Sequence, residues 1–348
     1  MAQINKPSLH FNTLLWQGNG NNARALTGVG FQPDFTWIKD RDDTESHCLT
    51  DAVRGATKSL RSNGNNAEAT DTDALQSFNS DGFTVGNQGQ VNKSNGDDFV
   101  GWNWKAGGGQ GSSNTDGSIN TTYTSVNTTA GFSISKYTGT GANATIGHGL
   151  GVAPAMMIIK ATSFTEDWIV YHQSTGNTEK LDLNTANAAD ASVTYWNNTS
   201  PTSSVFSVGT NDRPNKSGAT YVAYCFAEKK GYSKFGSYTG NGNSNGSFIY
   251  LGFKPAFFMI KRTESSGDKW RMWDNKRSPF NLVDDSLACN ETSAEYDDAS
   301  VSLDFLSNGV KMRMSGNGAG NGSGESYIYM AFAEEPIVGT NNVAATAK

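Results

Sequence analysis

The chain has 348 residues, of which 36% are hydrophobic and 39 are Gly, and its formal net charge is −6. This length is too great for one ordinary hydrophobic core and indicates two or three domains. The negative charge, without any Lys/Arg run, argues against nucleic-acid binding through a basic surface. Because no apolar stretch approaches the roughly 20 residues that span a bilayer, we also expect no membrane insertion.

Abundant Gly, Asn, Ser and Thr and few runs of helix formers indicate short strands joined by turns, and so an all-β fold. The first seven residues contain no apolar signal core, so we expect folding in a reducing cytoplasm rather than Sec export. Cys48, Cys225 and Cys289 are far apart and odd in number, which fits neither a disulfide framework nor a metal-binding pair. We expect them to be buried as small apolar residues.

One signature occurs three times along the chain. Its parts are a Gly-x-Gly turn, a Pro that follows the first Gly by 15 residues, and a Lys that follows the Pro by six residues. The copies contain Gly18, Pro33 and Lys39; Gly139, Pro154 and Lys160; and Gly240, Pro255 and Lys261. Each copy ends in an aromatic-rich run, at 99–104, 221–226 and 327–332. Segments that begin at His47, Trp168 and Trp270 and segments around Asn63, Asn184 and Asn290 also match.

Equal spacing in three places predicts three repeats of one structural unit. The Gly-x-Gly turn supplies positive φ, and the Pro opens a strand that is apolar on both faces. We expect this strand, at 35–39, 156–160 and 257–261, to lie beside the alternating final strand and to close a sandwich. The predicted fold is therefore all-β, with three tandem β-sandwich or jelly-roll-like units arranged as a rod.

The repeat also sets the predicted boundaries. They are an N-terminal arm at 1–10, unit 1 at 11–106, a flexible Gly/Ser/Thr-rich linker at 107–130 with an extra strand near 118–126, unit 2 at 131–230, unit 3 at 231–335 and a flexible tail at 336–348.

Few residues offer catalytic or cofactor chemistry. The Gly-rich turns precede apolar strands rather than helices, so they do not read as phosphate loops. The four His residues form no zinc-binding pair. Asp40, Asp42, Asp43 and Glu45 crowd one loop and are a weak candidate Ca²⁺ site, with a solvated acidic loop as the alternative. We expect no other cofactor.

Enzyme motifs are also missing from the pattern. The acidic residues do not recur as matched pairs such as glycoside hydrolysis uses, and no Ser or Cys nucleophile motif lies between a strand and a helix. We therefore expect no enzymatic activity. A polysaccharide-degrading enzyme is the least favoured hypothesis.

The tryptophans raise the possibility of glycan binding. Most occupy strand positions that recur among the units, where a large aromatic side chain is usually part of the core. Trp196 is less tied to the repeat, and with Tyr195 and Asn197 it is the candidate for an exposed contact with a sugar. A lectin-like glycan-binding module is therefore the alternative function.

Several stretches resemble a known family. They are 30–39, Asp51-Ala-Val-Arg-Gly55, 81–86, 104–108, 147–154 and 235–240. Together they resemble a domain of unknown function that is common in marine tailed-bacteriophage proteins, often described as tail-fibre or virion structural proteins. The resemblance spans roughly residues 11–335 and carries no catalytic residues.

What the resemblance implies is a virion structural protein exposed on the particle, as a tail fibre or a head-surface fibre or decoration, with a role in host adhesion. Such a protein assembles in the host cytoplasm and is located in the virion. Its expected partners are other virion proteins, further copies of itself in a homotrimer, and a host surface glycan.

Overall fold

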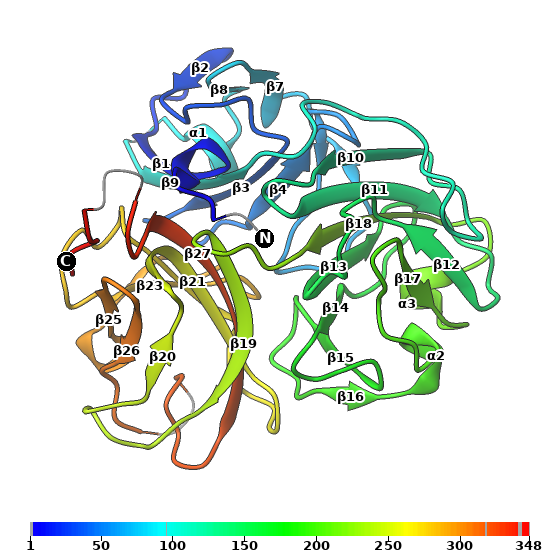
Figure 1. Ribbon diagram of the computed structural model, residues 1–348. Coiled ribbons are helices and arrows are strands. Elements are labelled where there is room, and N and C mark those ends of the chain that lie inside the picture. Colours follow the sequence, from blue (N-terminus) through cyan, green and yellow to red (C-terminus); the bar gives the residue numbers. More distant parts are fainter. Residues whose placement is uncertain (1–2, 95, 317–318, 340–342, 348) are drawn as a thin grey trace.

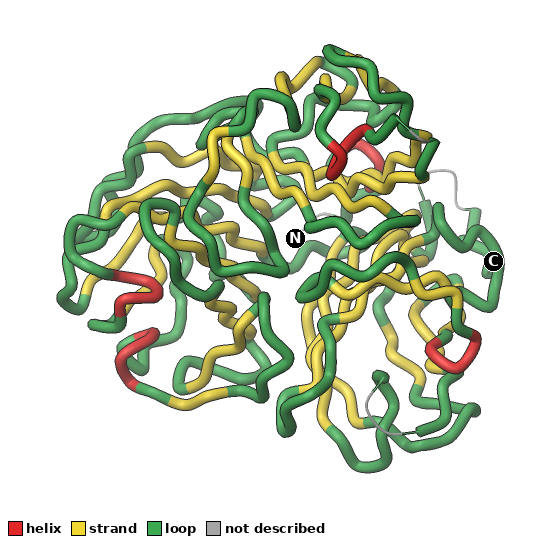
Figure 2. The backbone as a smooth tube through the Cα atoms, turned by 180° about the vertical axis from the view of Figure 1, so that it is seen from behind, coloured by secondary structure: helices red, strands yellow, loops and turns green. Residues whose placement is uncertain are grey.

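The three copies of the repeat form three β-rich units that lie side by side around a common centre, with the N-terminus near that centre in both views (Figure 1, Figure 2). The computed structural model of the chain describes residues 3–94, 96–316, 319–339 and 343–347. Within them almost every element is a strand, so the all-β prediction is confirmed. None of the described helices is long and apolar enough to span a membrane.

Unit 1 consists of a large and a small sheet with a shared core between them. The large sheet has the order β1 (Phe11–Gln17), β9 (Asp98–Trp104), β3 (Phe35–Asp40), β4 (Cys48–Asp51), and the small sheet has the order β2 (Arg24–Thr27), β8 (Gly82–Val85), β7 (Leu75–Asn79). The unit also contains the pair β5 (Lys58–Ser59) and β6 (Ala69–Thr70), the helical turn α1 (Gly89–Asn92) and, before β1, the 3-10 turn η1 (Pro7–Leu9).

Unit 2 repeats this plan with a longer large sheet. Its order is β10 (Tyr123–Asn127), β11 (Phe132–Thr138), β18 (Thr220–Phe226), β13 (Met156–Ala161), β14 (Ile169–His172), β15 (Glu179–Asp182), β16 (Asp190–Ala191), and the small sheet pairs β12 (Ala144–Gly147) with β17 (Val205–Val208). Two short helices, α2 (Val193–Trp196) and α3 (Asp212–Asn215), flank β17 in the chain. The strand expected near 118–126 is β10, which extends the large sheet of unit 2.

Unit 3 follows the same order. Its large sheet is β19 (Ser233–Thr239), β27 (Ser326–Pro336), β21 (Phe253–Arg262), β22 (Arg271–Asp274), β23 (Asp285–Ala288), β24 (Tyr296–Asp297), its small sheet is β20 (Phe248–Tyr250), β26 (Gly309–Met312), β25 (Leu303–Leu306), and the 3-10 turn η2 (Ala299–Val301) precedes β25. As predicted, the strand after the Pro and the final strand are antiparallel neighbours in every unit, in the pairs β3–β9, β13–β18 and β21–β27.

The Gly-x-Gly turns are closed in the same way in all three units. The second Gly has positive φ in each case, with values of 66°, 73° and 67° at Gly20, Gly141 and Gly242. A buried Asn accepts a hydrogen bond from the backbone N–H between the two glycines and donates its amide N–H groups to nearby carbonyls. These residues are Asn92, Asn215 and Asn321. The predicted turn chemistry is confirmed, and the turn needs a Gly because other side chains rarely adopt this φ.

Each large sheet is buried on both faces because it borders two different cores. In β13, Met157 and Ile159 face the small sheet of unit 2, whereas Met156 and Ile158 face the centre of the molecule. The same alternation divides β3 and β9 in unit 1 and β21 and β27 in unit 3. The inward faces of all three sheets therefore form one shared core.

Three aromatic residues at corresponding positions meet in that core. Trp104 ends β9, Phe226 ends β18, and Phe332 lies at the matching position of β27. Their ring centroids are 6.3 Å apart for Trp104 and Phe226, 5.6 Å for Trp104 and Phe332, and 6.0 Å for Phe226 and Phe332. The three units therefore surround one centre, and the predicted rod of separate sandwiches is not what the structure shows.

The segments outside the units are tied to them. Ile4 of the N-terminal arm is buried in the shared core, and its backbone N–H donates to Lys230 O at 3.0 Å. At the start of the expected flexible linker, the carboxylate of Asp34 accepts hydrogen bonds from the N–H groups of Ala106, Gly108 and Gly109, at 2.7, 3.0 and 2.8 Å. These bonds fix the first residues of that linker against unit 1.

The buried side chains agree with the sequence in two further respects. Cys48, Cys225 and Cys289 are free and fully buried, as expected for small apolar residues. All eight tryptophans are buried, at Trp16, Trp37, Trp102, Trp104, Trp168, Trp196, Trp270 and Trp273. This agrees with the prediction for the tryptophans at recurring strand positions but not with the prediction for Trp196.

The shared core predicts that the molecule unfolds as one body. Trp104→Ala removes a ring that contacts units 2 and 3, and it should lower the free energy of unfolding by about 3–5 kcal/mol. Differential scanning calorimetry should show one transition in the wild type, and the whole transition should move to lower temperature in the variant. Three transitions of which only one moves would mean that the units are thermodynamically independent.

Candidate functional site

The interfaces between units contain buried ion pairs and buried histidines. We call these interfaces seam 1–2, seam 2–3 and seam 3–1. One backbone hydrogen bond recurs at the same position in all three. The N–H of Glu68 donates to Thr162 O at 3.0 Å, that of Ala189 to Thr263 O at 2.8 Å, and that of Glu295 to Arg41 O at 2.7 Å. The units thus contact one another head to tail in a closed cycle.

A ring N–H also crosses each seam. Trp168 Nε1 donates to Arg61 O at 2.9 Å, and Trp270 Nε1 donates to Asp182 O at 2.9 Å. At the matching position, His47 Nε2 lies 3.1 Å from Ala288 O. Because Trp37 Nε1 donates to His47 Nδ1, the proton of this imidazole is on Nε2 and is donated to Ala288. The segments matched in the sequence are therefore the interface segments.

The matched asparagines hold these ring donors in place. Asn63, Asn184 and Asn290 each accept, through Oδ1, the backbone N–H of His47, Trp168 and Trp270 respectively, at 2.9 Å in every case. The carbonyl that accepts the ring N–H across the seam belongs to the residue two positions before the corresponding Asn of the neighbouring unit. Each Asn therefore fixes the ring donor of one seam and lies two residues from the carbonyl acceptor of the next seam.

Seam 1–2 contains a buried arginine. Arg54 Nε lies 2.5 Å from Asp51 Oδ2, and its other nitrogens lie 3.2 Å from Glu68 Oε2 and 3.3 Å from the hydroxyl of Tyr224. The side chains of Arg54 and Asp51 are both fully buried. Burial opposes the charge of Arg54, but Asp51, Tyr224 and Glu68 together outweigh it and raise the pKa of the guanidinium above its usual range. Breaking this pair from one side would leave a buried charge unpaired, which is strongly destabilising.

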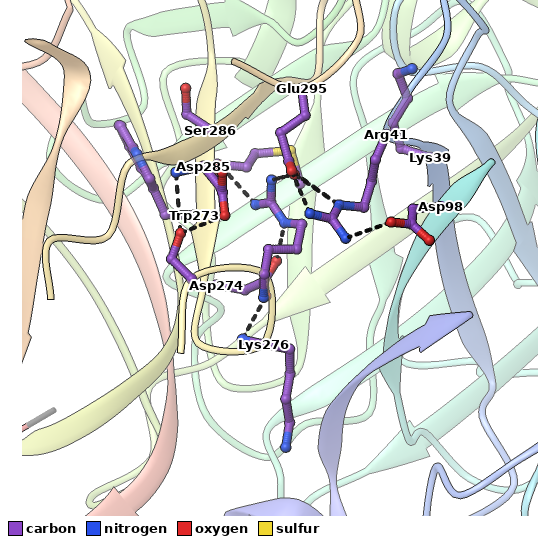
Figure 3. Close-up of polar contacts among 12 residues, drawn as sticks. Lys39, Arg41, Asp98, Trp273, Asp274, Lys276, Asp285, Ser286 and Glu295 are labelled. Carbon is purple, nitrogen blue, oxygen red and sulfur yellow. Dashed lines mark hydrogen bonds and ion pairs between the residues drawn. The ribbon is translucent and has the colours of Figure 1, made fainter. Parts of the chain in front are cut away.

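Seam 3–1 has the same arrangement at corresponding residues. Arg277 binds Asp274 at 2.5 Å and Glu295 at 2.6 Å, and its guanidinium lies 5.5 Å from the centroid of the Trp102 ring. Burial raises and Arg277 lowers the pKa of Asp274, and the net result is a pKa below the usual value. Figure 3 shows how Arg41 of unit 1 adds to this seam by binding Glu295 at 2.6 Å, with Asp98 beside it. The chain thus neutralises two arginines with acidic groups from both units.

Seam 2–3 departs from this pattern. The positions of the Asp, Arg and Glu at the other two seams are occupied here by His172, Thr175 and Ala189. Ser174 N donates to His172 Nδ1 at 3.1 Å, so His172 Nε2 is the donor to Tyr329 O at 3.2 Å across the seam. Burial lowers the pKa of His172 to about 4, so the imidazole is neutral at pH 7.

A cavity of about 630 Å³ lies at seam 2–3. Its walls come from both units and are Ser174, Thr175, Glu179, Ala189, Ser237, Thr263, Glu264, Ser326, Tyr327 and Ile328. Two of these residues, Thr175 and Ala189, stand where the other seams have an Arg and a Glu. The smaller side chains leave this space between the units. Sequence reasoning did not identify the cavity, but a comparison of Asp51-x-x-Arg54 and Asp274-x-x-Arg277 with the matching residues of unit 2 would have pointed to it.

Of the three residues predicted to contact a glycan, the structure buries Trp196 and Tyr195 and leaves Asn197 half-buried. Trp196 has 1% of its surface exposed, its Nε1 donates to Glu179 O at 2.8 Å, and its ring packs edge-on against Tyr171. Tyr195 is also buried, and its hydroxyl donates to Asp190 Oδ2 at 2.8 Å. Asn197 ends α2 with a φ of 51°. The prediction of an exposed Trp196 is wrong, because the short helix α2 turns this ring toward the core of unit 2.

The acidic loop is engaged with the rest of unit 1. Asp40 Oδ1 accepts the N–H groups of Asp42 and Asp43 at 3.0 Å each, and Asp42 Oδ2 accepts Asp98 N at 2.7 Å. The ammonium of Lys93 forms an ion pair with Asp43. Burial raises the pKa of Asp40 to about 6.

These contacts bear on metal binding. A Ca²⁺ ion at the acidic loop would have to compete with the Lys93 ammonium for Asp43. Among the described residues, one group of three possible metal ligands lies close together, and it is in unit 3. The carboxylate oxygens of Asp284, Asp285 and Asp297 all lie within 4.8 Å of one another.

His172 predicts acid sensitivity at seam 2–3. Its pKa is about 4 when folded and about 6.5 when unfolded, so the unfolded state binds more protons between these values. Stability should therefore fall as the pH drops from 6.5 to 4. His172→Gln keeps an N–H donor without a titrating group, and urea unfolding should show a smaller loss over this range, by up to about 1.4 kcal/mol per pH unit. Parallel pH curves for wild type and variant would contradict this role of His172.

Comparisons with known proteins define the family of the chain. No curated protein matches it. The model of a family described as a domain of unknown function (DUF7483) matches residues 6–336, which include all three units. The resemblance to a domain of unknown function is thus confirmed, whereas its association with phage particles stays a prediction. The chain belongs to the DUF7483 family of domains of unknown function.

Proposed function

We propose that the chain is a structural protein on the surface of a tailed-bacteriophage particle, in a tail fibre or a head-surface fibre or decoration, where it contributes to host adhesion. The resemblance to phage structural proteins suggests this role. The observation that carries it is the closed cycle of three units around one shared core. A surface protein of a particle has to keep its shape outside the cell, and this cycle gives the chain no free interface along which to open.

The use of charged residues supports the same role. Arg54, Arg277 and His47 are buried ionisable groups whose pKa values are shifted, and each is bonded across a seam or to a residue that crosses one. Burial lowers the pKa of His47 to about 3, and its ring nitrogens are both engaged. Groups held in this way stabilise an interface and are not available for proton transfer to a substrate.

The threefold plan also suggests how the chain joins a fibre. Many fibres are closed cyclic oligomers, and a homotrimer is the expectation from the sequence. Here the apolar faces of three sheets are already covered within one chain. We propose that one copy lies on the axis of a trimeric fibre or vertex and presents three similar units to the three partner chains.

Electron microscopy of particles tests the location. Purified phage labelled with an antibody against this chain should show the label at a fixed place on the tail or head in negative stain. Mass spectrometry of the same particles should detect the chain, and a host lysate carried through the same purification is the control. Absence of the chain from purified particles would refute the proposal.

The proposed assembly predicts a monomer in solution. Because the inward sheet faces are satisfied within the chain, the isolated protein should have the mass of one chain in multi-angle light scattering at micromolar concentration. A stable species with three times that mass would show that the chain forms its own trimer, and the single-copy arrangement would then be wrong.

A further inference from the structure

We propose that the cavity at seam 2–3 binds a guanidinium or ammonium group at the end of an aliphatic chain. The ligand would occupy the space that an arginine of the chain itself fills at the other two seams. This inference concerns the purified chain alone and does not depend on where the protein is located.

Seam 2–3 differs from the other two seams at one pair of positions that border its cavity. At seams 1–2 and 3–1, a guanidinium is inserted between two units and faces a Glu from the segment that forms the recurring backbone bond. Those pairs are Arg54 with Glu68 and Arg277 with Glu295. At seam 2–3 both members are absent, because Thr175 and Ala189 stand at their positions and border the cavity. The surrounding fold is unchanged, since the backbone bond from Ala189 to Thr263 is retained.

The walls of the cavity are rich in hydrogen-bond acceptors. Among the described residues that line the cavity, five carry hydroxyl groups on Ser or Thr, two are glutamates and none is a Lys or Arg. Glu264 Oε1 accepts a hydrogen bond from Ser326 Oγ at 2.7 Å, which leaves it further acceptor capacity. A guanidinium has five N–H donors and no acceptor, so a wall of hydroxyl and carboxylate oxygens complements it.

The cations beside the cavity are already engaged. Lys180 lies 2.7 Å from Asp182, and Arg262 lies 2.8 Å from Asp268 and 2.7 Å from Glu325. The Nζ of Lys261 is directed to Ala186 O, at 3.4 Å. Because these cations have other partners, none of the three forms an ion pair with Glu179 or Glu264 among the described residues.

The shape suits a cation on a stem. Ser174, Ser237 and Glu264 are exposed, so the cavity opens to solvent. Tyr327 and Ile328 are neighbours on β27 that belong to opposite faces of the sheet, and they are only 1% and 2% exposed. The inner end of the cavity therefore offers little apolar surface, and the aliphatic stem of a bound cation would extend toward the open side. A volume of about 630 Å³ falls in the range of small-ligand pockets and exceeds what a bare ammonium ion needs.

Isothermal titration calorimetry with agmatine tests the inference, because agmatine carries a guanidinium and an ammonium on an aliphatic chain. Wild-type protein should bind it, and the double variant Thr175→Arg/Ala189→Glu should not, because it fills the cavity with the Arg and the Glu that the other seams have at these two positions. The double variant Glu179→Gln/Glu264→Gln should bind at least about tenfold more weakly. Glu335→Gln, an exposed carboxylate at the far end of β27, is the matched control and should bind like the wild type.

Further arms of the experiment identify the source and the limits. A Gly-Arg-Gly peptide that binds more tightly than agmatine would assign the site to an arginine of a partner protein, and the opposite order would assign it to a free cation. Circular dichroism should show that the variants are folded, and the Gln variants provide the answer if the Arg/Glu variant is not. Absence of agmatine and peptide binding at millimolar concentration, binding of neutral methyl glycosides instead, or binding that the Gln variants leave unchanged would overturn the proposal.

Discussion

The structure depends on one constraint, which is that each large sheet has two apolar faces and needs a partner for both. The small sheet of the same unit covers one face. The other face has no cover within the unit, and it is buried only because three such faces meet at Trp104, Phe226 and Phe332. Burial of apolar surface contributes about 25 cal/mol per Å², so separating the units would expose a large unfavourable area. The repeat is therefore a part of one body and does not form a complete domain alone.

The seams follow from this packing. When two sheets with apolar inner faces approach, the polar groups at their edges lose water and need partners. The chain meets this need with the same set of bonds three times, through a backbone N–H, a ring N–H and an Asn that fixes the ring. Each unit uses one surface to contact the next and a different surface to contact the previous one. Such head-to-tail contacts form an open filament unless the rotation closes, and here three units close the cycle.

The sequence contains much of this fold and less of its assembly. The equal spacing of Gly, Pro and Lys predicts the turns, the strand after Pro33, Pro154 and Pro255, and its pairing with the final strand. It does not predict the cycle, because strands that are apolar on both faces can be covered by a second sheet or by a neighbouring unit. Trp196 misled for a related reason, since a residue outside the repeat need not be exposed. The acidic loop is balanced by Lys93, which lies about 50 residues away and cannot be assigned to Asp43 by spacing.

The difference between seam 2–3 and the other seams has a physical logic. A buried Arg is tolerated only beside its carboxylate partners, because an unpaired charge in an interface between packed units is strongly destabilising. Unit 2 has neither the Arg nor its Asp and Glu partners, so the seam loses mainly packing and hydrogen bonds. The shared core and the retained backbone bond hold the units at the same spacing, so the seam cannot collapse into the space that remains. The result is a cavity between rigid walls that carries two glutamates. The group that is missing from this cavity is the guanidinium that the other two seams still contain.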